Sequence, residues 1–198
     1  MRNLILQMQL SLDGYVAGNG GTLDWLVWSW GDEWTWDDRL RRYHEATVAS
    51  ADCILLSGKM AEGGFIDHWA AVANDRRSPQ SHFASDISNA RKVIFSTTLK
   101  ESRWENSVLA TRELTDEVAA LKREPGRNII AFGGAGFAST LIERDLVDEY
   151  QLIISPVILG SGLPIFAGLR KPLNLTLRSS DSYGEGIVVQ TYRRSRPS

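Results

Sequence analysis

The chain lacks the features of several protein classes. It has one cysteine in 198 residues, so no internal disulfide can form, and Cys53 lies in the apolar run CILL, where a free thiol behaves as a small buried side chain. No apolar run approaches the roughly 20 residues that a membrane-spanning helix needs. The start MRNLILQMQL is too short and too polar for a signal peptide. We therefore expect a cytoplasmic protein with no membrane partner.

The chain also has no large excess of charge of either sign. The formal net charge is −2, with both signs scattered along the chain, so no basic stripe is present to neutralise a phosphate backbone and nucleic acid is not expected as a partner. The three histidines, His44, His68 and His82, are far apart and form no ligand pair at helical spacing. We expect no metal site, and solvated or capping roles for these histidines.

What is present is a regular alternation of strand-like and helical patterns, typical of an α/β fold. We expect one domain over residues 1–198. Its sheet is mostly parallel, because helical patterns separate the strands, and it has an antiparallel C-terminal edge from two strand patterns joined by DSYGE. The expected strands are 3–10, 52–56, 92–96, 128–132, 150–155, 173–179 and 186–193, and the expected helices are 32–50, 113–122 and 135–145.

The segment AFGGAGFAS, residues 131–139, places a glycine cluster between an apolar run and a helical pattern. It is not a Walker phosphate loop, because no Gly-Lys-Ser/Thr follows, and Ser139 stands where a Rossmann fingerprint has its third glycine. Its backbone N–H groups at a helix start could still bind an anion. A tight strand-to-helix turn explains the glycines equally well, so both readings stay open.

Tryptophan is concentrated in one short segment. Trp25, Trp28, Trp30, Trp34 and Trp36 fall within twelve positions, after the glycine-bearing loop DGYVAGNGGTLDW. Such rings could stack on a flat heteroaromatic ligand, or they could build the core or a subunit interface. Carboxylates flank the same region and could hold the amide or amino groups of a ring, with solvation or helix capping as the alternative.

Three stretches together resemble the dihydrofolate-reductase-like family. They are LQMQLSLDGYVA, KVIFSTTL and GGAGFASTLIERDLVDEYQLIISPVILGSGLPIF. The resemblance is closer to the reductase domain of riboflavin-biosynthesis enzymes and its free-standing bacterial relatives. It implies a three-layer α/β fold that binds NADPH at the carboxyl ends of its strands and passes hydride to a small heterocyclic or ribityl-precursor substrate, as 5-amino-6-(5-phosphoribosylamino)uracil reductase does. It also implies a homodimer.

The resemblance assigns roles to particular residues. Asp13 and, as a weaker candidate, Asp32 would be catalytic, and Ser11, Gly14, Asp24 and Trp25 would border the substrate. The cofactor would lie against three segments: Gly58, Lys59 and Met60; Ser96, Thr97 and Thr98; and Gly133, Gly134, Ala135, Gly136 and Phe137.

The chain departs from the family pattern at two arginines that can meet the 2′-phosphate of NADPH. It has SGKM and FSTT at those places. Losing one charge-assisted contact of about 1.5–3 kcal/mol weakens a preference for NADPH over NADH by roughly ten- to a hundredfold, unless Lys59, Lys100 or Arg112 compensates. The alternative functions are a dihydrofolate or pteridine reductase, and a nucleotide-binding protein of this fold with little catalysis. No H-x-E or P-C-x-x-C motif of a zinc deaminase occurs.

Overall fold

The computed structural model describes residues 1–28, 30 and 34–195, which form two compact units. Unit 1 comprises Met1–Asn3 and Arg42–Gly134, and unit 2 comprises Leu4–Arg41 and the chain from Ala135 onward. Helix α1 (Asp38–Ala49) begins in unit 2 and ends in unit 1. The expectation of a single domain stays a prediction.

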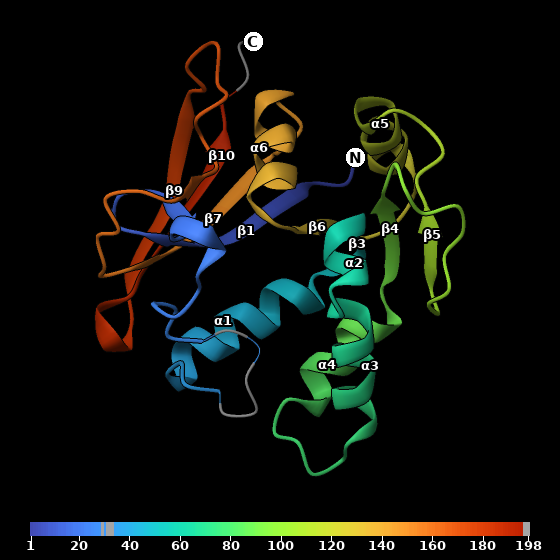
Figure 1. Ribbon diagram of the computed structural model, residues 1–198, viewed down its shortest axis with the longest axis horizontal. Helices are drawn as coiled ribbons and strands as arrows, with labels where there is room; N and C mark the ends of the chain where they lie inside the picture. The colour runs from blue at the N-terminus through green and yellow to red at the C-terminus, as the bar shows by residue number, and fades with distance from the viewer. Residues whose placement is uncertain (29, 31–33, 196–198) are drawn as a thin grey trace. The chain divides into compact units, whose positions relative to one another are not determined.

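Unit 1 is built on four parallel strands in the order β5 (Ser107–Leu109), β4 (Arg91–Phe95), β3 (Ala51–Ser57) and β6 (Asn128–Phe132) (Figure 1). The apolar residues in the middle of the central strands are buried, as parallel strands covered by helices require. The helices that lie wholly within this unit are α2 (Gly58–Glu62), α3 (Phe65–Asn74), α4 (Ser81–Asn89) and α5 (Leu114–Arg123).

Unit 2 contains the antiparallel edge. Its strand order is β1 (Leu4–Ser11), β7 (Glu149–Ser155), β10 (Val188–Arg194) and β9 (Leu175–Ser182). Strands β1 and β7 are parallel, whereas β10 is antiparallel to both β7 and β9. A small second sheet pairs β2 (Tyr15–Ala17) with β8 (Leu163–Pro164), and α6 (Ala135–Glu143) completes the unit. The expected fold class, α/β with mostly parallel strands and an antiparallel C-terminal edge, is confirmed.

The boundaries of one expected helix were wrong. The helix predicted from residue 32 begins at Asp38, because Asp37 acts as its N-cap: the Asp37 Oδ1 accepts from the Leu40 N–H at 2.8 Å. Trp36 falls inside the predicted range but precedes the observed helix, and its side chain is buried. Helices α3 and α4 were not predicted.

An aromatic cluster forms the core of unit 1 around Trp69 and Phe83, whose ring centroids lie 5.0 Å apart. His44 is part of this cluster, 4.9 Å from the ring of Phe83 and 6.4 Å from that of Phe132. The solvated or capping role expected for this histidine was therefore wrong. Burial lowers the pKa of His44 to about 3, so its imidazole is uncharged at neutral pH.

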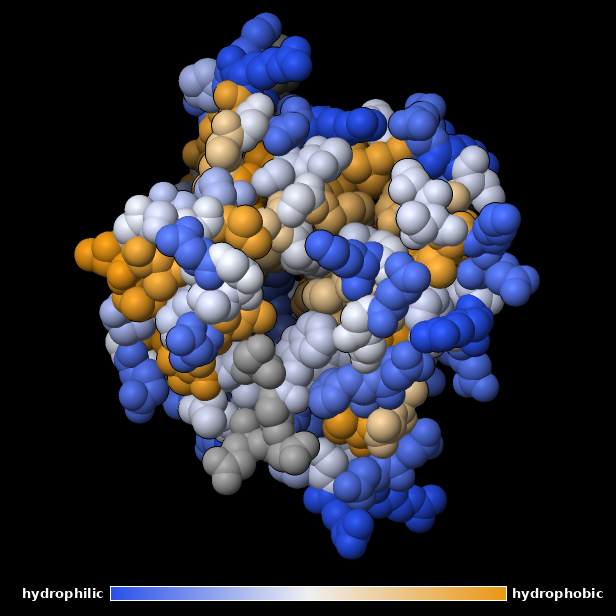
Figure 2. Space-filling model, in the orientation of Figure 1, coloured by the Kyte–Doolittle hydropathy of each residue, from blue (hydrophilic) through white to orange (hydrophobic). Residues whose placement is uncertain are grey.

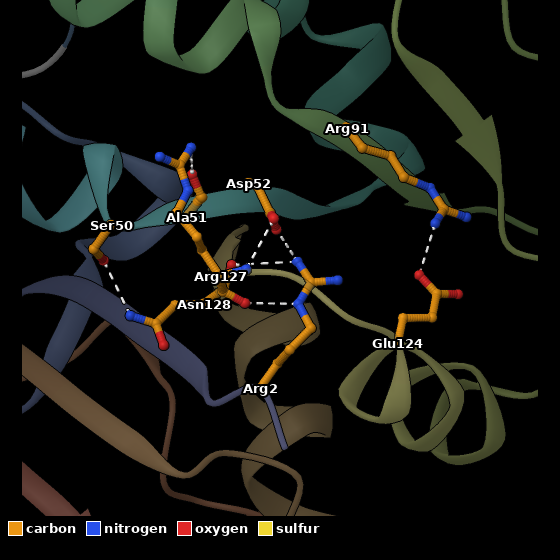
Figure 3. Close-up of polar contacts among 8 residues, drawn as sticks. All are labelled: Arg2, Ser50, Ala51, Asp52, Arg91, Glu124, Arg127 and Asn128. Atoms are coloured by element: carbon orange, nitrogen blue, oxygen red, sulfur yellow. Dashed lines mark hydrogen bonds and ion pairs between the residues drawn. The ribbon is translucent and has the colours of Figure 1, made fainter.

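The amino-terminal ends of β3 and β6 are held by a polar network in unit 1 (Figure 3). The buried Arg2 guanidinium pairs with Asp52 and donates from Nε to the Arg127 carbonyl at 2.6 Å. The Arg127 N–H donates to the second carboxylate oxygen of Asp52 at 2.9 Å. Gly126, at φ +150°, allows this closure, because a Cβ there would lie 2.8 Å from Asp52 Oδ2 and 3.1 Å from the Arg2 guanidinium carbon.

The surface of unit 2 carries several exposed apolar side chains. They are Leu12, Leu23, Ile158, Leu163, Phe166 and Leu177. Figure 2 shows apolar surface gathered on the left of the view, where Figure 1 draws the loops of this unit. In the part of the chain that the structure describes, no helix is both long and apolar enough to cross a membrane.

Candidate functional site

The carboxyl ends of three neighbouring strands in unit 1 bring most of the predicted cofactor residues to one edge. In the sheet register, Ser57 of β3 pairs with Phe95 of β4, and Leu56 of β3 pairs with Phe132 of β6. The next residues along the three strands are therefore neighbours at that edge. They include the predicted residues Gly58, Lys59, Met60, Ser96, Thr97, Thr98, Gly133 and Gly134.

Close packing explains the glycine at position 58. A Cβ at Gly58 would lie 2.6 Å from the Oγ of Ser96, so no larger residue fits unless the loop after β4 moves. The Ser96 hydroxyl organises that loop by accepting from the Thr98 and Leu99 N–H groups at 3.1 and 3.0 Å. Ser57 caps α2 by accepting from the Met60 N–H at 3.2 Å. These loops are thus fixed by their own contacts, while Lys59, Thr97 and Thr98 remain exposed.

The glycine cluster after β6 has a different character. Gly134 and Gly136 are exposed, and a Cβ at either position would meet no atom within 4 Å. Neither has a positive φ, so packing and backbone conformation do not account for glycine at these two positions. Of the other predicted residues, Ala135 and Phe137 lie in the first turn of α6, a helix of nine residues. The open space over this backbone fits the approach of an anionic ligand to the N–H groups at a helix start.

The turn after β1 in unit 2 contains three of the predicted residues. Gly14, at φ +87°, closes it with an N–H bond to the Ser11 carbonyl at 3.0 Å. The Ser11 hydroxyl donates to Asp13 Oδ1 at 2.7 Å and accepts from the Tyr15 N–H at 2.9 Å. Ser11, Asp13 and Gly14 therefore lie together in one hydrogen-bonded turn.

The Asp13 carboxylate also binds the loop after β7. Its two oxygens accept from the N–H groups of Leu159 at 3.1 Å and Gly160 at 2.7 Å. Desolvation acts to raise the pKa of Asp13, but the hydrogen bonds from Ser11, Leu159 and Gly160 outweigh it and leave the pKa below its ordinary value. Asp13 is thus ionised at neutral pH, which suits holding two loops together better than donating a proton. Its catalytic role stays a prediction.

The tryptophan segment lies beside β1, because Gln9 Nε2 donates to the Trp28 carbonyl at 3.1 Å. The rings of Trp28 and Trp34 are stacked at 5.3 Å and 17°, and Trp36 lies 4.9 Å from Trp28. Of the predicted substrate residues, Asp24 is exposed and Trp25 is half-buried in the turn closed by the Leu26 N–H and the Leu23 carbonyl. Asp32 lies outside the described residues.

Two further residues belong to this region and were not singled out from the sequence. Gln9 on β1 and Ser155 on β7 each carry a buried side-chain oxygen that has no hydrogen-bond partner among the described residues. The signal was visible in QMQLS, residues 7–11, where every second residue of an otherwise apolar strand is polar. A metal centre has no counterpart in this geometry, since no group of three or more His, Cys, Asp or Glu side chains is arranged for one in the described ranges.

The structure has an α/β fold with mostly parallel strands and an antiparallel edge, and comparisons with known proteins identify its family. The RibD C-terminal domain family matches residues 2–189, so the chain belongs to that family of riboflavin-biosynthesis-type reductase domains. The uncharacterized protein YyaP of Bacillus subtilis is 28% identical over 193 residues, covering 96% of this chain and 94% of YyaP.

Two longer relatives match this chain over only about half of their own length. The riboflavin biosynthesis protein RibD of Corynebacterium ammoniagenes is 23% identical over 91% of this chain and 50% of its own length. The crystal structure of the Thermotoga maritima diaminohydroxyphosphoribosylaminopyrimidine deaminase/5-amino-6-(5-phosphoribosylamino)uracil reductase superposes with a TM-score of 0.65 at 16% identity, covering 98% of this chain and 57% of that one. The likeness to the Thermotoga maritima structure shows only that the two chains share a fold.

Proposed function

We propose that the protein is an NADPH-dependent reductase of a small nitrogen heterocycle or its ribityl precursor, similar to 5-amino-6-(5-phosphoribosylamino)uracil reductase. Membership of the family supports the reaction class. The observation that carries the proposal is the open backbone at Gly134, next to two further loops at the same edge of unit 1. The cytoplasmic location inferred from the sequence is part of this proposal.

The residues at that edge fit a dinucleotide. The N–H groups around Gly134 would hold the pyrophosphate, and the loop Ser96–Thr98 of the same unit would lie beside the ribose. Reduced nicotinamide supplies a hydride when it is bound. The chain's own contribution would be to orient the two reactants, since hydride transfer depends on close approach. Asp13 would serve the substrate side by tying the turn after β1 to the loop after β7.

Cations at the same edge bear on the choice between NADPH and NADH. Lys59 and Lys100 are exposed and close in sequence to Gly58 and to Ser96–Thr98, so either could meet a 2′-phosphate. Arg112 is a weaker candidate, because its guanidinium lies 3.9 Å from Glu117. The loss of NADPH preference expected from the missing arginines would then be partly offset.

The test is the substitution Gly134→Val. A side chain there would project into open space, so the melting temperature should stay within about 2 °C of wild type, while access of a phosphate to the backbone is blocked. We expect the Kd for NADPH, measured by calorimetry, to rise at least about tenfold, or about 1.4 kcal/mol. Gly134→Ala should give a smaller increase. An unchanged Kd in the folded valine variant would contradict the phosphate assignment.

Turnover separates the proposal from its rivals. NADPH oxidation with an aminouracil substrate supports it, whereas oxidation with dihydrofolate alone indicates a pteridine-type reductase. That reaction calls for a substrate-holding carboxylate. Tight NADPH binding without turnover of either compound indicates a nucleotide-binding protein.

A further inference from the structure

One face of the β1–β7 strand pair is polar although it is buried. The even positions of both strands are apolar, whereas the odd positions carry glutamine or serine on β1 at 7, 9 and 11, and on β7 at 151 and 155. The register pairs odd with odd, Gln7 with Gln151 and Ser11 with Ser155, so these side chains share one face. Buried polar groups are costly unless they are hydrogen-bonded, so their partners must be identified.

Most of these groups are satisfied within the unit. Gln7 Nε2 donates to Gln151 Oε1 at 2.8 Å, and Gln151 Nε2 donates to Glu149 Oε1 at 2.9 Å. At the carboxyl end, the Ser11 hydroxyl is held between Asp13 and the Tyr15 N–H. The polar face is therefore an ordered network with two gaps.

The gaps are Gln9 Oε1 and Ser155 Oγ, both buried and without a hydrogen-bond partner among the described residues. An amide flip of Gln9 would not pair its oxygen. Its Nε2 donates to the Trp28 carbonyl, and after a flip the Oε1 would face that carbonyl oxygen. Gln9 therefore presents an acceptor in a fixed direction. Ser155 presents a hydroxyl that can donate or accept.

The spacing of these two groups matches a small ring. Gln9 pairs with Ile153, so Ser155 lies one strand across and two residues further on the same face. With strands about 4.8 Å apart and a rise of about 3.3 Å per residue, the two Cβ atoms are about 8 Å apart. Because the glutamine side chain is long, Gln9 Oε1 and Ser155 Oγ lie closer together than the two Cβ atoms. A substituted six-membered ring can bridge the remaining distance. Trp25, in the segment next to this strand, adds a buried indole N–H that also lacks a partner in the described ranges.

We propose that Gln9 and Ser155 recognise the ring of the substrate and set its specificity for an amino-substituted pyrimidinedione. An N–H or amino group of the ring donates to Gln9 Oε1, and a ring carbonyl accepts from Ser155 Oγ. Their place at the carboxyl end of parallel strands, beside the Asp13 turn, is where open α/β sheets bind ligands. The inference rests on the proposed function and adds the residues that select the substrate.

Both atoms are buried, and the Trp28 backbone covers the Gln9 amide, so the ring reaches Gln9 as the stretch around Trp25–Trp28 shifts. Leaving two polar atoms unpaired under this cover costs stability that a ligand recovers. The protein without ligand should therefore tolerate loss of the Ser155 hydroxyl, and the complex should not.

The experiment measures binding of 5,6-diaminouracil and, separately, of NADPH by calorimetry, together with melting temperature. In Ser155→Ala the melting temperature should stay the same or rise, while the Kd for 5,6-diaminouracil rises at least tenfold. Gln9→Met keeps the length of the side chain and removes the carbonyl, and it should weaken binding similarly. The Kd for NADPH should stay within twofold in both variants.

The matched control is Ser139→Ala, which removes a serine hydroxyl that already donates to the Ile165 carbonyl at 3.0 Å. It should lower the melting temperature and leave the Kd for 5,6-diaminouracil unchanged. The inference is overturned if both site variants bind 5,6-diaminouracil as the wild type does, or if they lose NADPH instead. It is also overturned if the wild type binds NADPH but not 5,6-diaminouracil, a result that leaves the reductase proposal standing. A wild-type protein that binds neither compound contradicts both this inference and the reductase proposal.

Discussion

His44 is an imidazole packed between phenylalanine rings, and its burial predicts a pH dependence of stability. The pKa is lowered from 6.5 to about 3 in the folded protein, so the unfolded chain binds a proton first as the pH falls. The contribution of the neutral His44 imidazole to the free energy of unfolding is complete above pH 6.5. It is lost between pH 6.5 and 3, at about 1.4 kcal/mol per pH unit. Lowering the pH from 7 to 5 should therefore reduce the free energy of unfolding by about 2 kcal/mol through this residue. Urea titrations at several pH values measure it.

The control for this residue is His82, whose side chain is exposed and lies 3.9 Å from Asp86. His44→Leu should flatten the decline in stability between pH 7 and 5, whereas His82→Gln should leave it in place. If the decline is the same in His44→Leu and wild type, other groups cause it.

At the scale of single elements, the network that joins Arg2, Asp52 and Arg127 anchors the start of the chain to β3 and β6. The Arg2 side chain is 6% exposed and that of Asp52 is 36% exposed. Asp52→Ala leaves a buried guanidinium without its carboxylate, a change that usually costs about 3–5 kcal/mol of stability. We expect a smaller loss of about 2 kcal/mol here, because Asp52 is about a third exposed and two backbone carbonyls still accept from Arg2. Urea unfolding measures this loss.

The ion pair of Arg91 and Glu124 is the matched control, drawn in the same view in Figure 3. Its side chains are 45% and 43% exposed, so Glu124→Ala should cost no more than about 1 kcal/mol. Equal losses in Asp52→Ala and Glu124→Ala would show that the Asp52 network is no stronger than a surface pair.

Elements with a strong local pattern were predictable, and those fixed by distant contacts were not. The apolar run NIIAF indicated β6, which spans Asn128–Phe132 as expected. The start of α1 was misplaced because a tryptophan-rich periodicity continues upstream of the Asp37 cap. The candidate site shows the same division. The loops after β3, β4 and β6 followed from the family resemblance, but the Gln7–Gln151 pair joins residues 144 apart, so no local pattern separates it from the unpaired Gln9 oxygen.

At the scale of the whole molecule, we propose that the protein is a homodimer. The family resemblance implies this, but the apolar residues of β7 and β10 offer little exposed surface for it, because Leu152, Ile153 and Val189 are buried within unit 2. The argument that remains is β9, which pairs on one side with β10 and exposes 52% of Leu177. An edge strand with an exposed leucine is suited to pairing with another chain.

Light scattering at micromolar concentration should give about twice the 22.1 kDa mass of one chain. Leu177→Lys should shift the mass toward one chain, because a lysine on an edge strand opposes pairing. The matched variant Leu163→Lys changes an exposed leucine on β8 and should leave the mass unchanged. A wild-type mass near 22.1 kDa would contradict the dimer.

The stacked tryptophans also make the protein its own optical reporter. Two indole rings 5.3 Å apart and 17° from parallel are close enough for their electronic transitions to couple, which splits an absorption band into circular-dichroism components of opposite sign. Trp36, tilted at 55° beside Trp28, adds a second coupled pair. Because five of the seven tryptophans belong to residues 25–36, the aromatic spectrum reports mainly on the segment that covers Gln9. Displacement of that segment is therefore visible without any label, as a loss of the paired bands.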